Sequence, residues 1–171
     1  MKKLLLMVIL FGAGLLIATQ AHALTFVDVV DPEPDVALSM FNPSYTFTHN
    51  ILDHGFNPAT NTITSANISI RFWDQGFDWI ATENATISFD GNNDVANFEV
   101  DTGTYSYLVN AAYLQNDGLL NVTITRTWGN FWFEDSTLTV NANASSVVPE
   151  PISLLLMGSG LVGLFGLRRK V

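Results

Sequence analysis

The sequence predicts an all-β protein, an antiparallel two-sheet β-sandwich or jelly roll, flanked by an N-terminal signal peptide and a C-terminal transmembrane helix. Three observations support this prediction. Apolar and polar residues alternate through the middle of the chain, turn-forming residues separate the alternating runs, and a charge-free apolar stretch lies near each end. Period-two alternation bounded by turns is typical of antiparallel strands with one buried face.

The alternation is clearest in the runs 45–49 (YTFTH), 68–72 (ISIRF) and 138–140 (LTV). In each run the large residues occupy every second position, and Ser, Thr or Arg fills the positions between them. Successive side chains of a strand point to opposite faces of its sheet, so one set faces a core and the other faces solvent.

Turn-forming residues separate the strand-like runs. They occur as "DHGFNPATN" at 53–61, "DQGFD" at 74–78, "DGNND" at 90–94, "DTG" at 101–103 and "NDG" at 116–118. Gly and Asn tolerate positive φ, and Asp can close its own turn. We expect about eight short strands, with one helical turn in "VNAAYLQ" at 109–115.

The N-terminus has the features of a secretory signal peptide. Lys2 and Lys3 precede an apolar run from Leu4 to Ala18, and Ala21 and Ala23 flank His22 in a pattern that signal peptidase accepts. Cleavage is expected after Ala23. The predicted organisation is a signal peptide at 1–23, a β-sandwich ectodomain at 24–140, a small, polar linker at 141–148 and a sorting tail at 149–171.

The charge and the cysteine count exclude several kinds of function. Between residues 24 and 148 two basic residues accompany fifteen acidic ones, a net formal charge of −13. Such a surface repels phosphate backbones, so we expect no nucleic-acid partner. The chain has no cysteine, which removes disulfides, thiol catalysis and the usual zinc ligand.

A calcium site is one candidate. Asp90, Asn92 and Asp94 place oxygen ligands at alternate positions, and Asp101 is twelfth in that stretch. An EF-hand needs a glycine where Val95 stands, and it needs flanking helices. A looser cation site at a sheet edge remains open, with further oxygens from Asp53, Asn57 or Asp78. The competing interpretation is a hairpin turn with solvated acids, and no cofactor beyond calcium is expected.

A sugar-stacking surface is the second candidate. Aromatic residues are frequent here, and aromatic faces beside Asn and Asp are what pyranose recognition uses. Trp73 and Trp132 have the opposite parity to Phe72 and Phe131, so either tryptophan can be exposed. The competing interpretation is that these aromatic residues fill the core.

Catalysis has little support, and we expect a protein that is not an enzyme. A Ser/His/Asp triad would require His49 or His54, and no G-x-S-x-G motif surrounds any serine. Paired carboxylates for glycoside hydrolysis could be drawn from Glu83, Glu99 and Glu134, but the sequence does not give the distances between them.

The C-terminal stretch Ile152–Leu167 predicts a transmembrane helix. It contains sixteen residues without a charge, about 24 Å of helix, which spans a bilayer with some thinning. Pro149 and Pro151 oppose helix formation before it. The basic residues that follow it predict a cytoplasmic C-terminus, with the ectodomain outside.

The tail resembles the PEP-CTERM protein-sorting tail of Gram-negative bacteria. It has the motif Val148-Pro149-Glu150-Pro151, then the glycine-containing apolar stretch 152–167, then the basic stop Arg168-Arg169-Lys170. The resemblance implies export, transient retention in the inner membrane and processing near Pro-Glu-Pro by an exosortase. Such proteins accompany exopolysaccharide production.

A looser resemblance concerns the ectodomain, which is similar to the uncharacterised all-β ectodomains that carry this tail. It rests on "YTFTHNI", "GFNPATNTITSANISI" and "LNVTITRTWGNFWFEDSTLTV" in corresponding order, and it implies no active residues.

The expected function is that of a structural or adhesive protein of the cell surface, extracellular matrix or biofilm. The expected partners are signal peptidase, an exosortase, the inner membrane transiently and extracellular polysaccharide. Two alternatives stay open: a calcium- or carbohydrate-binding module, and a surface enzyme that acts on polysaccharide.

Overall fold

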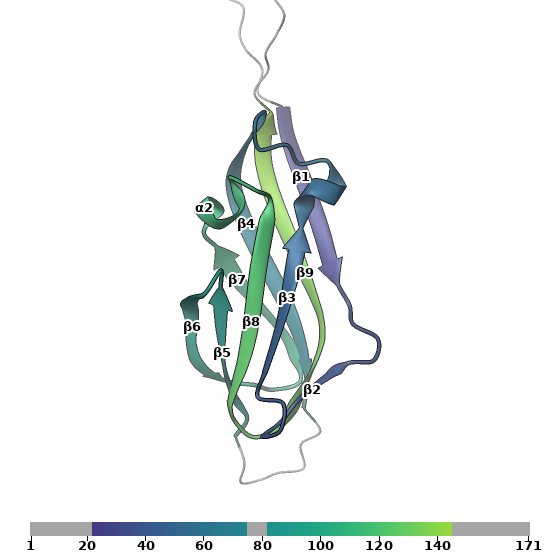
Figure 1. Cartoon of the computed structure of the whole chain (residues 1–171), viewed down its shortest axis with the longest axis vertical. Coiled ribbons are helices and arrows are strands. Elements are labelled where there is room, and N and C mark those ends of the chain that lie inside the picture. The colour runs from purple at the N-terminus through teal and green to yellow at the C-terminus, as the bar shows by residue number, and fades with distance from the viewer. Residues whose placement is uncertain (1–21, 75–81, 145–171) are drawn as a thin grey trace, which may run out of the picture. The chain divides into compact units, whose positions relative to one another are not determined.

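The computed structural model describes residues 22–74 and 82–144, and these residues form two antiparallel sheets (Figure 1). The prediction of an all-β protein with two antiparallel sheets is confirmed. Both sheets belong to one compact unit, His22–Ser145. Since the described core residues all lie inside this unit, the segment has what it needs to fold by itself.

The larger sheet has five strands and the smaller one has four. The five-stranded sheet has the order β1 (His22–Val30), β9 (Phe131–Ala144), β4 (Asn61–Trp73) and β7 (Gly103–Val109), with β2 (Val36–Leu38) also paired to β9. The four-stranded sheet has the order β3 (Ser44–Asn50), β8 (Leu119–Trp128), β5 (Asn84–Phe89) and β6 (Asn92–Glu99). In the described part of the chain, two short helices connect strands, η1 (Ile51–His54) and α2 (Ala111–Leu114). The helix α2 confirms the helical turn predicted in 109–115.

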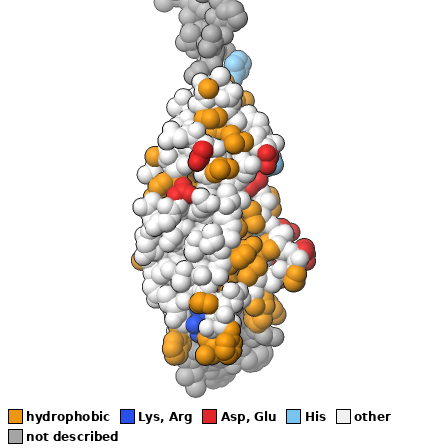
Figure 2. Space-filling view, in the orientation of Figure 1, with side chains coloured by type: hydrophobic (Ala, Val, Ile, Leu, Met, Phe, Trp, Pro, Cys, Tyr) orange, Lys and Arg blue, Asp and Glu red, His pale blue; other side chains and the backbone are white. Residues whose placement is uncertain are grey.

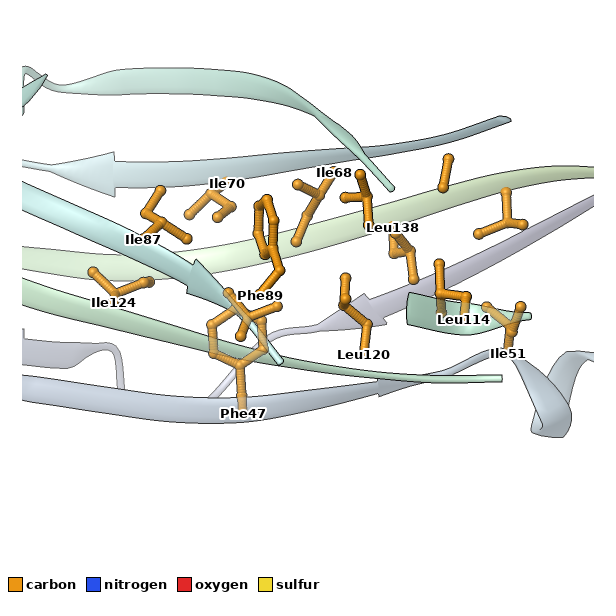
Figure 3. Close-up of a cluster of buried hydrophobic side chains, with 14 of the residues drawn as sticks. Phe47, Ile51, Ile68, Ile70, Ile87, Phe89, Leu114, Leu120, Ile124 and Leu138 are labelled. Carbon is orange, nitrogen blue, oxygen red and sulfur yellow. The ribbon is translucent and has the colours of Figure 1, made fainter. Parts of the chain in front are cut away.

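The core lies between the two sheets, as Figure 3 shows for side chains of β4, β5 and β8. Ile68, Ile70 and Phe72 of β4 are completely buried, and so are Val122 and Ile124 of β8. These are alternate residues of each strand, so the alternation in the sequence correctly identified the buried face. Each fully buried side chain of this size contributes about 1.5–3 kcal/mol through removal of apolar surface from water.

The turn between β5 and β6 confirms the turn predicted at 90–94, but the observed turn is shorter. Asp90 and Gly91 have φ of 48° and 79°, as a two-residue type I′ hairpin requires. Only these two residues of "DGNND" form the turn, because β6 already begins at Asn92.

The predicted linker 141–148 is wrong at its start, because β9 continues through Ala144. Ala142 is buried, and the Asn141 side chain accepts a hydrogen bond from Thr25 Oγ1 and donates one to Ser65 Oγ. The ectodomain therefore extends beyond the predicted boundary at residue 140. Alternating Asn and Ala is a period-two strand pattern whose small side chains are also typical of linkers.

β1 begins at His22, before the predicted cleavage point after Ala23. His22 and Ala23 pair with Ala144 and Asn143 of β9, so cleavage there removes two paired residues from β1. The rest of the predicted signal peptide, the predicted helix 152–167 and the tail motifs lie outside the described residues. Within residues 22–74 and 82–144, no helix has the length and apolar character needed to cross a membrane.

Candidate functional site

Trp73 and Trp132 lie side by side on the outer face of the five-stranded sheet. They are direct cross-strand partners on β4 and β9, and their ring centroids are 5.0 Å apart with a 47° tilt. Trp73 is 39% exposed and Trp132 is partly buried. Both have the opposite parity to the buried Phe72 and Phe131, so neither tryptophan belongs to the core between the sheets.

A β-bulge in β9 places two carboxylates next to this tryptophan pair. Arg71 pairs with Asp135 and Phe72 pairs with Phe133, so Glu134 is an extra residue in β9. The Arg71 Nε lies 2.8 Å from Glu134 Oε2, and Arg71 Nη2 lies 2.5 Å from Asp135 Oδ2. One guanidinium therefore contacts both carboxylates.

We call Arg71, Trp73, Trp132, Glu134 and Asp135 the outer-face cluster. Sequence reasoning identified the two tryptophans as candidates but missed Arg71 and Asp135 as their neighbours. The parity of Arg71, two residues before Trp73, was a usable sign that the two share a face. The parity of Asp135 was misleading, because the bulge reverses the alternation of β9.

The same bulge turns Ser136 into the core, where it meets a buried histidine. His49 on β3 and Ser136 on β9 are both fully buried, and His49 Nε2 lies 2.9 Å from Ser136 Oγ. On the other side of the ring, His49 Nδ1 lies 2.7 Å from Asp28 Oδ2 on β1. The Asp28 carboxylate also accepts the Asn50 backbone N–H and contacts His54 Nε2.

The neutral form of His49 with its proton on Nδ1 satisfies this Asp28–His49–Ser136 network. The neutral imidazole donates its Nδ1–H to the Asp28 carboxylate, and the Ser136 hydroxyl donates to Nε2. Burial lowers the pKa of His49, and this effect exceeds the opposing hydrogen bond and charge of Asp28. The network thus connects β3 of one sheet to β1 and β9 of the other through a neutral histidine.

The order of groups matches that of a Ser/His/Asp triad, but its burial does not suit nucleophilic catalysis. Ser136 and His49 have 0% exposure, so a substrate carbonyl would have to enter the packed interior to reach Oγ. His49 was the histidine that sequence reasoning considered for a triad, and its partners Asp28 and Ser136 were not identified. The three carboxylates considered for glycoside hydrolysis lie in different surroundings: Glu83 is buried, Glu99 is exposed, and Glu134 is in the outer-face cluster.

The acidic residues of the predicted calcium site lie in and after the β5–β6 turn and hold it with hydrogen bonds. Asp90 Oδ1 accepts from the backbone and side-chain N–H groups of Asn121, at 3.0 and 3.1 Å. Asp94 accepts from the Phe89 backbone N–H and from the Tyr113 hydroxyl. The Asn92 amide donates to the Phe89 carbonyl.

These contacts give the two acids a structural role in the hairpin, and the calcium site stays a prediction. Across 22–74 and 82–144, no three His, Asp or Glu side chains gather in a way that could hold a metal ion. Of the three additional ligands considered, Asp53 accepts a hydrogen bond from the Asn50 amide, Asn57 accepts from the Ala59 backbone, and Asp78 lies outside the described residues.

Comparisons with known proteins give one family match, and it lies at the C-terminal end of the chain. No curated protein is significantly similar to the chain. Two similar solved structures are the "Crystal Structure of FLHE" (12% identity, 71% of this chain, 97% of that chain, TM-score 0.35) and the "Structure of infectious bursal disease virus Gx strain" (11% identity, 75% and 38%, TM-score 0.24). Both are too distant to indicate a function. A family model described as the PEP-CTERM protein-sorting motif matches residues 147–170, so this protein carries a PEP-CTERM sorting motif in its C-terminal region.

Proposed function

We propose that this protein is an exported, exosortase-processed component of the cell surface or extracellular matrix, with a structural or adhesive role and no catalytic activity of its own. The PEP-CTERM motif at 147–170 carries the proposal, because that motif marks exosortase-dependent proteins that are anchored and then cleaved. In this proposal signal peptidase removes residues 1–23, helix 152–167 holds the precursor in the inner membrane, and the exosortase acts near Pro149-Glu150-Pro151.

The ectodomain supports a structural role outside the cell. We take its two sheets as the layers of a β-sandwich that is stable without disulfides, since the chain has no cysteine and its core is closed by both sheets. Figure 2 shows one face of the molecule on which uncharged polar side chains and backbone predominate, with patches of hydrophobic side chains among them and few charged ones. Such a surface stays soluble and suits contact with hydrated polymers.

The short connection between domain and motif is consistent with processing close to the folded domain. Four residues, 145–148, lie in the sequence between Ala144, where β9 and the described part of the chain end, and Pro149. Four extended residues reach at most about 14 Å. We therefore expect the mature protein to end only a few residues after β9.

Mass spectrometry of the protein from its native host tests the proposal. The mature form should begin at Leu24 and end between Val148 and Pro151. In a host strain without its exosortase, the precursor should keep Arg168-Arg169-Lys170 and remain in the membrane fraction. A surface form that retains these three basic residues in the normal host would contradict the proposal.

Substitution of the motif provides a matched control. Changing Pro149 and Pro151 to Ala should block processing, whereas changing Ser145 and Ser146 to Ala, in the same short connection, should leave it intact. Equal processing of both variants would show that cleavage does not depend on the Pro-Glu-Pro motif.

A further inference from the structure

We propose that the outer-face cluster of Arg71, Trp73, Trp132, Glu134 and Asp135 binds a neutral saccharide, as part of the adhesive role proposed above. The cluster combines two adjacent indoles with a guanidinium and two carboxylates on one face of a sheet. This combination of apolar rings and planar hydrogen-bonding groups is what recognition of a pyranose requires.

The two indoles supply the apolar part of the site. Trp73 and Trp132 come from neighbouring strands, and their rings lie 5.0 Å apart outside the core. A pyranose ring has an apolar C–H face that packs against an aromatic ring, and indole offers the largest such ring with little conformational entropy to lose. Because the register of β4 and β9 fixes both tryptophans, the surface is formed before the ligand binds.

The ion-paired groups supply the polar part of the site. Arg71 stands two residues before Trp73 on the same face of β4, and it is held by Glu134 and Asp135. Arg has five N–H donors and each carboxylate has about four lone-pair positions, so these two ion pairs leave both donors and acceptors available. Sugar hydroxyls are donors and acceptors at once, and they match such a mixed set.

The charge of the site selects a neutral ligand. The cluster has one positive and two negative groups, and the ectodomain has a large excess of acidic residues. A uronic-acid or sulfated polymer would be repelled at this surface. Beyond the cluster the outer face carries uncharged residues, both polar and apolar: Ser69 and Ser106 are hydrogen-bonded across β4 and β7 at 2.9 Å, and Val27, Val29 and Leu108 are exposed. A neutral chain can therefore continue along the sheet.

Affinity electrophoresis of the compact unit 22–145 tests this inference. The protein is run through gels that contain dextran, mannan or a mixed-linkage β-glucan, with alginate as the acidic polymer. We expect at least one neutral polysaccharide to retard the protein and alginate to have no effect. Failure of all three neutral polymers to retard it, or stronger retardation by alginate, would overturn the proposal.

Variants connect the retardation to the cluster. Trp73→Ala and Trp132→Ala should each weaken binding by about fivefold or more, the loss expected at a central aromatic contact. Trp128→Ala is the matched control, since Trp128 is 63% exposed but lies at the end of β8 in the other sheet. An equal loss in this control would show that the binding site is not the cluster.

A further variant keeps both indoles in place. The double change Glu134→Gln with Asp135→Asn should also weaken saccharide binding several-fold, and the urea midpoint of unfolding checks that the variant is folded. Unchanged binding would refute the proposed contacts between the carboxylates and the sugar hydroxyls. Failure of this inference is distinct from failure of the proposed function. A protein that is processed near Pro149 but binds no saccharide refutes the binding site alone, and one that binds saccharide but keeps its basic end refutes the processing alone.

Discussion

Removing the Ser136 hydroxyl should destabilise the ectodomain through His49, and the effect should depend on whether His49 is present. In Ser136→Ala the fully buried Nε2 of His49 loses its hydrogen-bond donor. An unpaired buried acceptor costs about 1–3 kcal/mol. The change removes a single oxygen atom, so little of the loss comes from a cavity.

The variant at the other end of this hydrogen bond, His49→Phe, should lose a comparable amount of folding stability for a different reason. His49→Phe leaves the Ser136 hydroxyl unpaired, and it deprives Asp28 of one of its contacts while Asn50 and His54 remain. The double variant His49→Phe with Ser136→Ala leaves neither buried partner behind. Its destabilisation should therefore be smaller than the sum of the single losses by about 1 kcal/mol or more.

Urea unfolding followed by tryptophan fluorescence measures these free energies on the unit 22–145. The four proteins of the cycle should have equal m-values, which indicates that the unfolding transition exposes the same surface. Additivity within about 0.5 kcal/mol would refute the reasoning, because it would mean that His49 and Ser136 do not interact.

The same network predicts how stability depends on pH. Burial lowers the pKa of His49 below 6.5, so the unfolded chain binds a proton at a higher pH than the folded protein does. This histidine's contribution is fully present above pH 6.5 and is lost as the pH falls toward the folded pKa. Between pH 7 and 5.5 the wild type should lose stability more steeply than His49→Phe, and identical slopes would contradict the lowered pKa.

Two further predictions follow from the fold, and a third tests the calcium site expected from the sequence. The unit 22–145 should give a β-type circular dichroism spectrum that a reducing agent does not change, and a mainly helical spectrum would be incompatible with two β-sheets. Ending the chain at Val140 should lower its melting temperature, because the first residues of β1 lose their partners in β9; an unchanged melting temperature would restore the linker interpretation. Millimolar calcium should raise the melting temperature through a weak site of about 10⁻⁴–10⁻³ M, and Asp90→Ala with Asp94→Ala should abolish that increment. Equal stabilisation by sodium chloride at matched ionic strength would indicate screening of the acids alone.

The sequence by itself determined which residues of the regular strands face the core and that the chain carries a sorting motif. Alternation in 68–72 identified the buried Ile and Phe residues, because successive side chains of a strand without a bulge point to opposite faces of the sheet. Asp90-Gly91 identified a hairpin turn for an equally local reason, the positive φ that Asp and Gly tolerate. The tail was recognisable because its three elements occur in a fixed order along the chain.

Only the tertiary structure decided which side chains meet. The extra residue Glu134 reverses the alternation of β9, and this reversal brings Asp135 to Arg71 outside and Ser136 to His49 inside. The local sequence pattern does not predict this bulge, because the bulge depends on how β9 pairs with β4. The strand at 141–144 was missed for the same reason: Asn and Ala carry little hydrophobic signal of their own, and their pairing with β1 and β4 makes them part of the sheet.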